Sequence, residues 1–433
     1  MAEIRPFRAW RYNRQLAKNI DSLTSPLFDV VSEKQREALY ETPYNSINIS
    51  VPRGNTPARS AIDRLTEWKE KGVIEQDEIP AIYVYYQYFS LAGSTKEYCR
   101  KGFVIMIKAY DWHERTLLRH ENTIPTAVND RIELLKATQL HASPTHGLYS
   151  DDTFELERYM DESMRHPVYE SEDYQGVKDV LSIIHDAKVI QRFIDKMDRK
   201  QVILADGHHR YESSLTYRKE MMAKHPEHTG EEPWNYHMMY LTNMESDDLR
   251  ILPTHRLVHD LENFSEEELL KTLEPNFIIK EVNNPSDIHE IILGKKWAFG
   301  LLFRDNTYKV RLKPEVFDSL DWKFPEVVKQ LDLTVMHYFI LEKALGIPGK
   351  KQRESTNITF ERNFGECLRS VLSGKSQFAL ITQDISMEEV KKVCFSGYTL
   401  PQKSTYFYPK VISGFLYGSI QPDEFAQKAH SLF

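Results

Sequence analysis

The stretch QVILADGHHRY (201–211) constrains the fold of this chain more than any other part of the sequence. QVILA is short and apolar with two β-branched residues, which predicts a buried strand. DGHH (206–209) predicts a tight loop, and RYESSLTYRKEMMAKH (210–225) predicts a helix. A strand that passes through a single glycine into a helix is typical of α/β folds. We therefore expect a sheet whose strands are connected by helices.

Strand and helix patterns continue along the whole chain and predict a mixed α/β fold with mixed sheets, of the α+β kind. AIYVYYQYF (81–89) and GFVIMIKAYDW (102–112) predict an antiparallel strand pair. Residues 151–175 are acidic and predict a loop, and Asp186 is the expected N-cap of a helix over 187–197. The remaining predicted elements are strands at 47–52, 234–244 and 376–383, a hairpin over 296–312, and helices over 57–71, 129–142, 264–273, 331–345 and 386–397.

The length of 433 residues predicts two or three domains, at about 150 residues each. The expected breaks are 226–233 and 346–356. We divide the chain into residues 1–225, which carry the DGHH loop, and residues 226–433, a second α/β portion. The segment 400–410 is expected to fold back onto the site of the first portion.

The charge balance and the cysteine content exclude several classes of protein. The chain carries 56 Lys and Arg against 64 Asp and Glu, a net charge of −8. Nucleic acid is therefore not an expected partner, because neutralising phosphates needs an excess of cations. No stretch approaches the roughly 18 consecutive apolar residues of a membrane span, and the polar, basic start is not a secretory signal. Cys99, Cys367 and Cys394 lie far apart in sequence, so we expect a reduced, cytoplasmic protein without a cysteine zinc site.

The DGHHR sequence (206–210) carries the clearest chemistry. Gly207 permits the turn, and His208, His209 and Arg210 lie at the first turn of the predicted helix, where free N–H groups and the helix dipole favour an anion such as phosphate. Asp206 would hold Mg²⁺ or accept a hydroxyl proton. Either histidine could face the ligand. The alternative is that Asp206 caps the helix and that the histidines are surface polar residues.

RHENT (119–123) is a second cluster. His120 and Glu121 suit an acid/base pair or a metal-binding carboxylate, although Ile124 breaks the HExxH zinc pattern. The alternative is a polar loop with a hydrogen-bonded histidine.

LPQKSTYFYPK (400–410) places Lys403, Ser404, Thr405 and Lys410 around three aromatic residues. The lysine and the two hydroxyl residues predict a phosphate or carboxylate clamp, but the upstream glycines of a Walker motif are absent. The alternative is an aromatic packing segment with solvated lysines.

Three weaker candidates would bind the substrate together with His120. LPTHRLV (252–258) offers His255 and Arg256, and VPRG (51–54) offers Arg53 beside a glycine. For the first pair, the alternative is an interior histidine and a surface arginine.

Many of these segments, taken in order, resemble one bacterial family. The chain is similar to the family named for domain of unknown function 1015 from about residue 4 to residue 418. One departure is visible, because Pro26-Leu27-Phe28-Asp29 stands where members usually read PPYD. The matching segments are FRAWRYN, SPLFDVVS, PYNSINISVPRG, RHENTIP, NDRIELLKAT, SPTHGLYSDD, ILADGHHRYESSLTYR, LPTHR, LDLTVMH and LPQKSTYFYPKVISG.

The strand–DGHHR–helix unit also resembles the ParB/sulfiredoxin-like fold, whose members include free-serine kinases. This resemblance implies that Asp206, His208, His209 and Arg210 contact a nucleotide phosphate and its Mg²⁺. The serine kinases use a glutamate from an earlier segment as base, and Glu121 is the candidate here. Residues 1–225 would then be the ParB/sulfiredoxin-like nucleotide-binding portion.

We therefore predict a Mg²⁺-dependent phosphotransferase that uses ADP or ATP and acts on serine or phosphoserine in either direction. The alternatives are a phosphoserine phosphatase and a non-catalytic, ParB-like nucleotide-binding module. A sulfiredoxin-like reductase is disfavoured, because His208 stands where that chemistry needs a cysteine and no other cysteine lies nearby.

Overall fold

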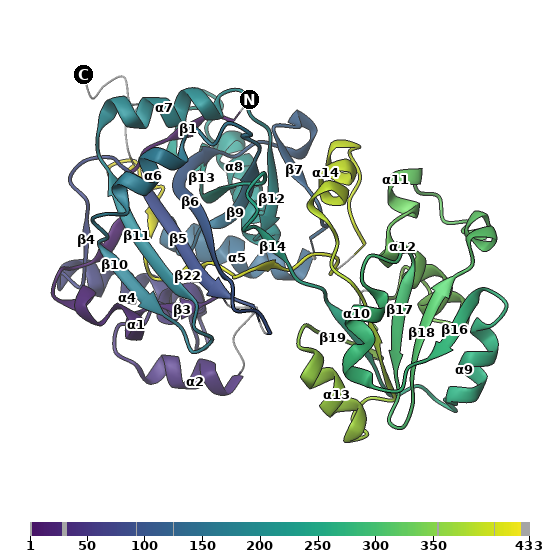
Figure 1. The fold of residues 1–433 in the computed structure, drawn as a ribbon. Coiled ribbons are helices and arrows are strands. Elements are labelled where there is room, and N and C mark those ends of the chain that lie inside the picture. The colour runs from purple at the N-terminus through teal and green to yellow at the C-terminus, as the bar shows by residue number, and fades with distance from the viewer. Residues whose placement is uncertain are drawn as a thin grey trace. The chain divides into compact units, whose positions relative to one another are not determined.

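The computed structural model describes residues 2–27, 33–91, 93–123, 125–352, 355–401 and 403–425. The chain divides into two compact units (Figure 1), one formed by Met1–Leu249 with Pro409–Phe433 and the other by Arg250–Tyr408. The division follows Leu249 instead of residue 225, because β13 (Tyr236–Asn243) lies inside the sheet of the first unit.

The first unit is built on a nine-stranded mixed sheet, as the predicted fold class requires. β13 runs parallel to its neighbour β9, and β12 runs antiparallel to β9 but parallel to β7. The strand order is β10 (Tyr169–Glu172), β11 (Lys178–Ile184), β5 (Ile82–Ser90), β6 (Glu97–Lys108), β13, β9 (Thr145–Tyr149), β12 (Val202–Asp206) and β7 (Leu117–Arg119), with β1 (Ile4–Arg5) paired to β6.

The two faces of this sheet bury separate hydrophobic cores, because successive side chains of a strand point to opposite sides. Tyr85 of β5 packs in the core that contains Trp68, whereas Val84 packs in the core that contains Phe193. Helices α6 (Glu157–Ser163), α7 (Ala187–Met197) and α8 (His208–Lys224) supply the second core; α4 (Pro57–Glu70), the N-terminal segment and residues 411–425 supply the first.

Short elements complete the first unit and tie its last segment to the rest. β22 (Ile412–Ser413) pairs with β3 (Ser25–Pro26), and β23 (Gly418–Ser419) pairs with β8 (Leu140–His141). The others are β2 (Trp10–Tyr12), which pairs with β4 (Ile74–Gln76), and helices α1 (Ile20–Leu23), α2 (Glu33–Glu41), α3 (Ile47–Ser50) and α5 (Pro125–Thr138).

The second unit contains a six-stranded sheet in which all neighbours are antiparallel. Its order is β16 (Phe277–Glu281), β18 (Thr307–Leu312), β17 (Ala298–Leu302), β20 (Phe378–Ile381), β15 (His255–Val258) and β19 (Ile358–Glu361). A separate pair joins β14 (Arg250–Ile251) to β21 (Phe407–Tyr408). The helices are α9 (Glu266–Leu273), α10 (Ile288–Ile292), α11 (Glu326–Lys329), α12 (Asp332–Val335), the π-helix Met336–Ala344, α13 (Phe364–Leu372) and α14 (Met387–Phe395).

Several local predictions are confirmed. The segments 81–89 and 102–112 pair antiparallel as β5 and β6. The Asp186 side chain caps α7 by accepting the N–H groups of Lys188 and Val189 at 2.8 and 3.0 Å.

The strand predicted at 47–52 is wrong, because residues 47–50 form the single helical turn α3. The Asn45 side chain accepts the Ile47 N–H at 2.9 Å and donates to the carbonyls of Ser22 and Thr24. Local bonding of this kind competes with a strand, and the apolar alternation of 47–52 does not reveal it.

The loop predicted over 151–175 is wrong in part, because it contains α6 and β10. In β10, Tyr169 and Ser171 are buried whereas Glu170 and Glu172 are exposed. The acidic residues thus occupy the outer face of an edge strand. In the segment SPLFDVVS, which resembles the family, residues 28–32 lie outside the described residues.

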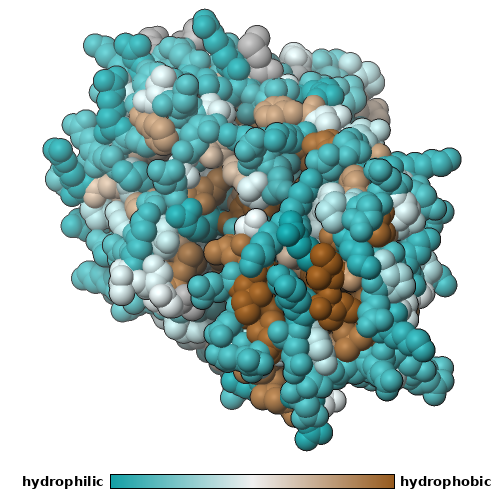
Figure 2. Space-filling model, turned by 45° about the vertical axis from the view of Figure 1, so that its right-hand side comes forward, coloured by the Kyte–Doolittle hydropathy of each residue, from teal (hydrophilic) through white to brown (hydrophobic). Residues whose placement is uncertain are grey.

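Most of the surface visible in Figure 2 is hydrophilic, and hydrophobic side chains gather in a few separate places. Within the described ranges, no helix combines the length and the apolar character that crossing a bilayer requires.

Candidate functional site

Two parallel strands bring two polar segments to one edge of the large sheet. β7 and β12 pair in parallel, with Leu204 opposite Arg119. Their carboxyl ends therefore lie at the same edge, where His120 and Glu121 follow β7 and Asp206 ends β12.

Gly207 makes the turn between β12 and α8. Its φ of +88° lies in the left-handed region, and a Cβ atom there would stand 2.6 Å from Cγ2 of Thr145. Only glycine fits this position without strain. The first helical bond runs from the Tyr211 N–H to the Gly207 carbonyl at 3.0 Å, so the preceding amides lie at the anion-binding end of α8.

Asp206 lies between two cations. Its Oδ1 accepts from Nζ of Lys410 at 2.7 Å, and its Oδ2 lies 3.5 Å from Nη2 of Arg210. Burial alone would raise the pKa of this carboxyl group, but Lys410 and Arg210 outweigh it and hold the pKa well below its ordinary value. The N-cap of α8 is Gly207 without a side-chain cap bond, so Asp206 is not a simple helix cap.

Lys410 reaches Asp206 from the last segment of the chain. Gln87 donates to the Lys410 carbonyl at 3.0 Å, and Arg100 donates to the Pro409 carbonyl. The end of the predicted clamp segment 400–410 thus contacts the DGHHR loop.

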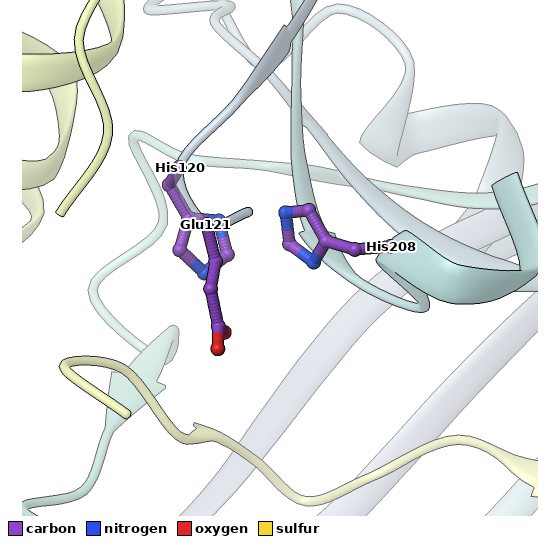
Figure 3. Close-up of side chains that lie close together, drawn as sticks. All are labelled: His120, Glu121 and His208. Atoms are coloured by element: carbon purple, nitrogen blue, oxygen red, sulfur yellow. The ribbon is translucent and has the colours of Figure 1, made fainter. Parts of the chain in front are cut away.

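His120, Glu121 and His208 form a compact donor cluster (Figure 3). One nitrogen or oxygen of each lies within 4.8 Å of the others, and the imidazole rings are 4.5 Å apart. Nδ1 of His120 bonds to the Leu204 carbonyl at 2.6 Å, which fixes the ring. Burial lowers the pKa of both histidines, so both are neutral at neutral pH. Nε2 of His208 is buried without a hydrogen-bond partner among the described residues.

The two adjacent histidines therefore differ. His208 is 7% exposed and belongs to the cluster, whereas His209 is partly exposed on the neighbouring side of the helix. Arg210 bonds through Nη1 to Oγ of Ser143 at 2.8 Å and to the Pro144 carbonyl at 2.7 Å, so it also fixes the segment before β9.

The other predicted site residue of the first unit lies in a different setting. Arg53 pairs with Glu37 of α2 at 3.0 Å and lies over the Tyr40 ring, so it is joined to α2 instead of the Asp206 cluster.

The remaining candidates belong to the second unit. His255 and Arg256 are 1% and 0% exposed. Nδ1 of His255 accepts the Thr382 N–H at 3.3 Å, and burial lowers the pKa of His255 to about 3. Burial lowers the pKa of Arg256 to about 9, and Arg256 donates to the Thr254 carbonyl. The alternative of a surface arginine is wrong, because Arg256 is fully buried. Lys403, Ser404 and Thr405 belong to the same unit, and the backbone φ of Lys403 is +55°.

Sequence reasoning missed two polar residues of the same sheet. His146 pairs with Asp206 across β9 and β12, and its Nε2 bonds to Oγ1 of Thr242 at 2.7 Å. Arg100 of β6 is 2% exposed. A basic residue inside an otherwise apolar strand pattern was the available signal for Arg100, and the histidine of SPTHGLY was the signal for His146.

A family model described as "Protein of unknown function (DUF1015)" matches residues 4–334 of this chain. The comparison with curated proteins gave no match.

Three solved structures show distant similarity. A conserved hypothetical protein from Pyrococcus furiosus is 11% identical, with a TM-score of 0.37, and the match covers 76% of this chain and 97% of that one. A free serine kinase in complex with AMP is 12% identical, with a TM-score of 0.35 and coverage of 76% and 93%. SbnI with a C-terminal truncation, from Staphylococcus aureus, is 11% identical, with a TM-score of 0.34 and coverage of 72% and 85%. Similarity at this level assigns no activity to the chain.

Proposed function

The chain belongs to the family described as Protein of unknown function (DUF1015), and from its Asp206 site we propose that it is a phosphotransferase. Its substrates would be serine or phosphoserine, or a similar small hydroxy compound, together with a nucleotide such as ADP or ATP. The observation that carries the proposal is the partly buried Asp206 carboxylate, held by Lys410 and Arg210 at the start of α8, at the sheet edge where Glu121 follows β7.

Phosphoryl transfer requires positioning and charge neutralisation more than covalent chemistry. The first amides of α8, with Lys410 and Arg210, would hold the phosphate oxygens. Glu121 is half-buried and would accept the proton of the substrate hydroxyl. His208 is neutral and buried, so its unpartnered Nε2 would accept or donate one hydrogen bond at the same place.

A divalent cation fits this site through Glu121. Mg²⁺ prefers oxygen ligands and commonly takes one or two carboxylates together with substrate phosphates. It would neutralise phosphate charge when bound. Asp206 would serve as a second ligand only by exchanging its contact with Lys410 for the ion.

The cluster of His120, Glu121 and His208 favours a phosphoserine phosphatase as the second candidate. Two neutral imidazoles and one carboxylate suit a transition-metal ion better than Mg²⁺, and such ions make bound water acidic. A ParB-like nucleotide-binding module would use the same contacts without turnover.

Phosphorus NMR of the full chain with phosphoserine and Mg²⁺, with and without ADP or AMP, separates these functions. Decay of phosphoserine only with nucleotide, with a new nucleotide phosphate signal, would support the phosphotransferase. Decay to inorganic phosphate without nucleotide would replace it with the phosphatase. Unchanged spectra in every tube would contradict serine chemistry and favour another hydroxy compound or the binding module.

A further inference from the structure

A row of polar side chains crosses one face of the large sheet beneath Pro409 and Lys410. The register places Asp179 of β11 opposite Gln87 of β5, and Gln87 opposite Arg100 of β6. On the same face, the register places Tyr240 of β13 opposite Val104, four residues along β6 from Arg100, and it places His146 of β9 opposite both Tyr240 and Asp206.

Arg100 is the least satisfied member of this row. Its Nη2 donates to Oε1 of Gln87 and to the Pro409 carbonyl, whereas its Nε and Nη1 are buried without a hydrogen-bond partner in the described part of the chain. Within the same residues, no carboxylate lies at ion-pair distance from Arg100. Arginine stays charged in proteins, and a buried charge without a counter-ion is strongly unfavourable. A buried donor of this kind calls for an anion or ordered water.

The guanidinium of Arg100 lies toward the Asp206 site. It stands 5.6 Å from the centre of the Tyr240 ring, and the imidazole of His146 stacks on the same ring at 5.2 Å. Pro409 and Lys410 are consecutive in the chain. The Pro409 carbonyl accepts from Arg100, and Nζ of Lys410 donates to Asp206. These two contacts therefore join Arg100 and Asp206 to one short segment of the chain.

We propose that Arg100 binds the carboxylate of the substrate whose phosphoryl group or hydroxyl lies at Asp206. This inference rests on the proposed function and narrows its substrates to small acids that carry a hydroxyl or phosphate a few carbons from the carboxylate. The incoming carboxylate accepts from one of the two unpartnered donors of Arg100, Nε or Nη1, which point in different directions, and a charge-assisted bond of this kind is among the stronger hydrogen bonds in proteins.

The test compares O-phospho-L-serine with O-phosphoethanolamine, which lacks the carboxylate, by calorimetric titration of the full chain. The wild type is expected to bind phosphoserine about tenfold or more tightly. Arg100→Met removes this preference and leaves the binding of phosphoethanolamine unchanged. The melting temperature of Arg100→Met without ligand is measured beside these titrations to check that the variant folds, because the substitution removes a buried charge but also leaves Gln87 and the Pro409 carbonyl without this donor.

Arg5→Met is the matched control. Arg5 is a buried arginine of the same unit, but it is ion-paired with Glu3 and Glu231. Its removal is expected to lower the melting temperature and to retain the preference for phosphoserine.

The outcomes separate this inference from the proposed function. Phosphoserine that binds no tighter than phosphoethanolamine, or a preference that survives Arg100→Met, overturns the role of Arg100. Binding of phosphoserine through Arg100 without any binding of phosphoethanolamine keeps that role and contradicts the phosphate site.

Discussion

The dipeptide His-Arg occurs once in each unit, and the two copies have different structural roles. His209-Arg210 lies where β12 has ended and α8 begins, and Arg210 contacts the Asp206 carboxylate. His255-Arg256 lies inside β15, between β20 and β19, and both side chains are buried. Position in the fold separates them, because a side chain at a strand end can meet residues from other loops.

The comparison extends to the histidines themselves. His208 is buried next to His120 and Glu121, and its Nε2 has no hydrogen-bond partner in the described ranges. Nδ1 of His255 instead accepts the backbone N–H of Thr382, the residue that follows the adjacent strand β20. A buried nitrogen without a partner points to chemistry, whereas a bonded one points to structure.

The largest expected effect is that of Glu121→Gln on turnover. If Glu121 accepts the hydroxyl proton, the amide lowers the rate of phosphoryl transfer by about 100-fold or more and leaves the binding of phosphate in the absence of Mg²⁺ intact. The rate is measured by phosphorus NMR under saturating substrate. Glu157→Gln is the control, because Glu157 is a half-buried glutamate of the same unit that accepts a hydrogen bond from Asn243 of β13. Equal rates for Glu121→Gln and the wild type would remove Glu121 from the mechanism.

The second prediction compares the fully buried Asp179 of the first unit with the partly buried Asp332 of the second unit. Burial raises the pKa of Asp179 to about 7 and that of Asp332 to about 6. The folded protein therefore keeps a proton that the unfolded chain loses near pH 4, and folding stability falls as pH rises from about 4 to each folded pKa. For Asp179 the loss is on the order of 4 kcal/mol by pH 7.

The measurement is the melting temperature of Asp179→Asn and Asp332→Asn against the wild type from pH 4.5 to 8. In Asp179→Asn, the amide keeps the oxygen that accepts from Gln87 at 2.7 Å. The amide does not titrate in this pH range. Asp179→Asn should gain stability over the wild type up to about pH 7, and Asp332→Asn only up to about pH 6. A constant difference across this range would show that Asp179 is already ionised in the folded state.

The sequence predicts those parts of the site that depend on consecutive residues, and it does not predict the parts that depend on strand pairing. The order strand, Gly207 and helix is written in consecutive residues, and so is the N-cap Asp186. The meeting of His120 with His208 depends on the parallel pairing of β7 with β12, which are separated by more than 80 residues. The burial of Arg100 likewise depends on Gln87 and Pro409, which no local pattern connects to it. Non-local strand order therefore decided which candidates came together.

The smallest expected effect is the loss of folding free energy when a glycine with positive φ is replaced by alanine. The two glycines compared are Gly207 at the site and Gly346 in the second unit. Gly207 has φ +88° and its added Cβ would meet Thr145 at 2.6 Å, whereas Gly346 has φ +68° and open space within 4 Å. Gly346→Ala should cost about 1–2 kcal/mol of folding free energy from backbone strain alone. Gly207→Ala should cost about 1–3 kcal/mol more, because the Thr145 side chain must also shift.

Thermal unfolding of the two variants tests this difference, and phosphate titration adds a second readout at the site. Gly207→Ala is expected to melt at a lower temperature than Gly346→Ala and to weaken phosphate binding, because the shift displaces the first turn of α8. Gly346→Ala should bind phosphate as the wild type does. Equal melting temperatures and equal phosphate affinities would mean that the β12–α8 turn tolerates a side chain. The tight approach of Gly207 to Thr145 would then no longer be a reason for glycine in the DGHHR loop.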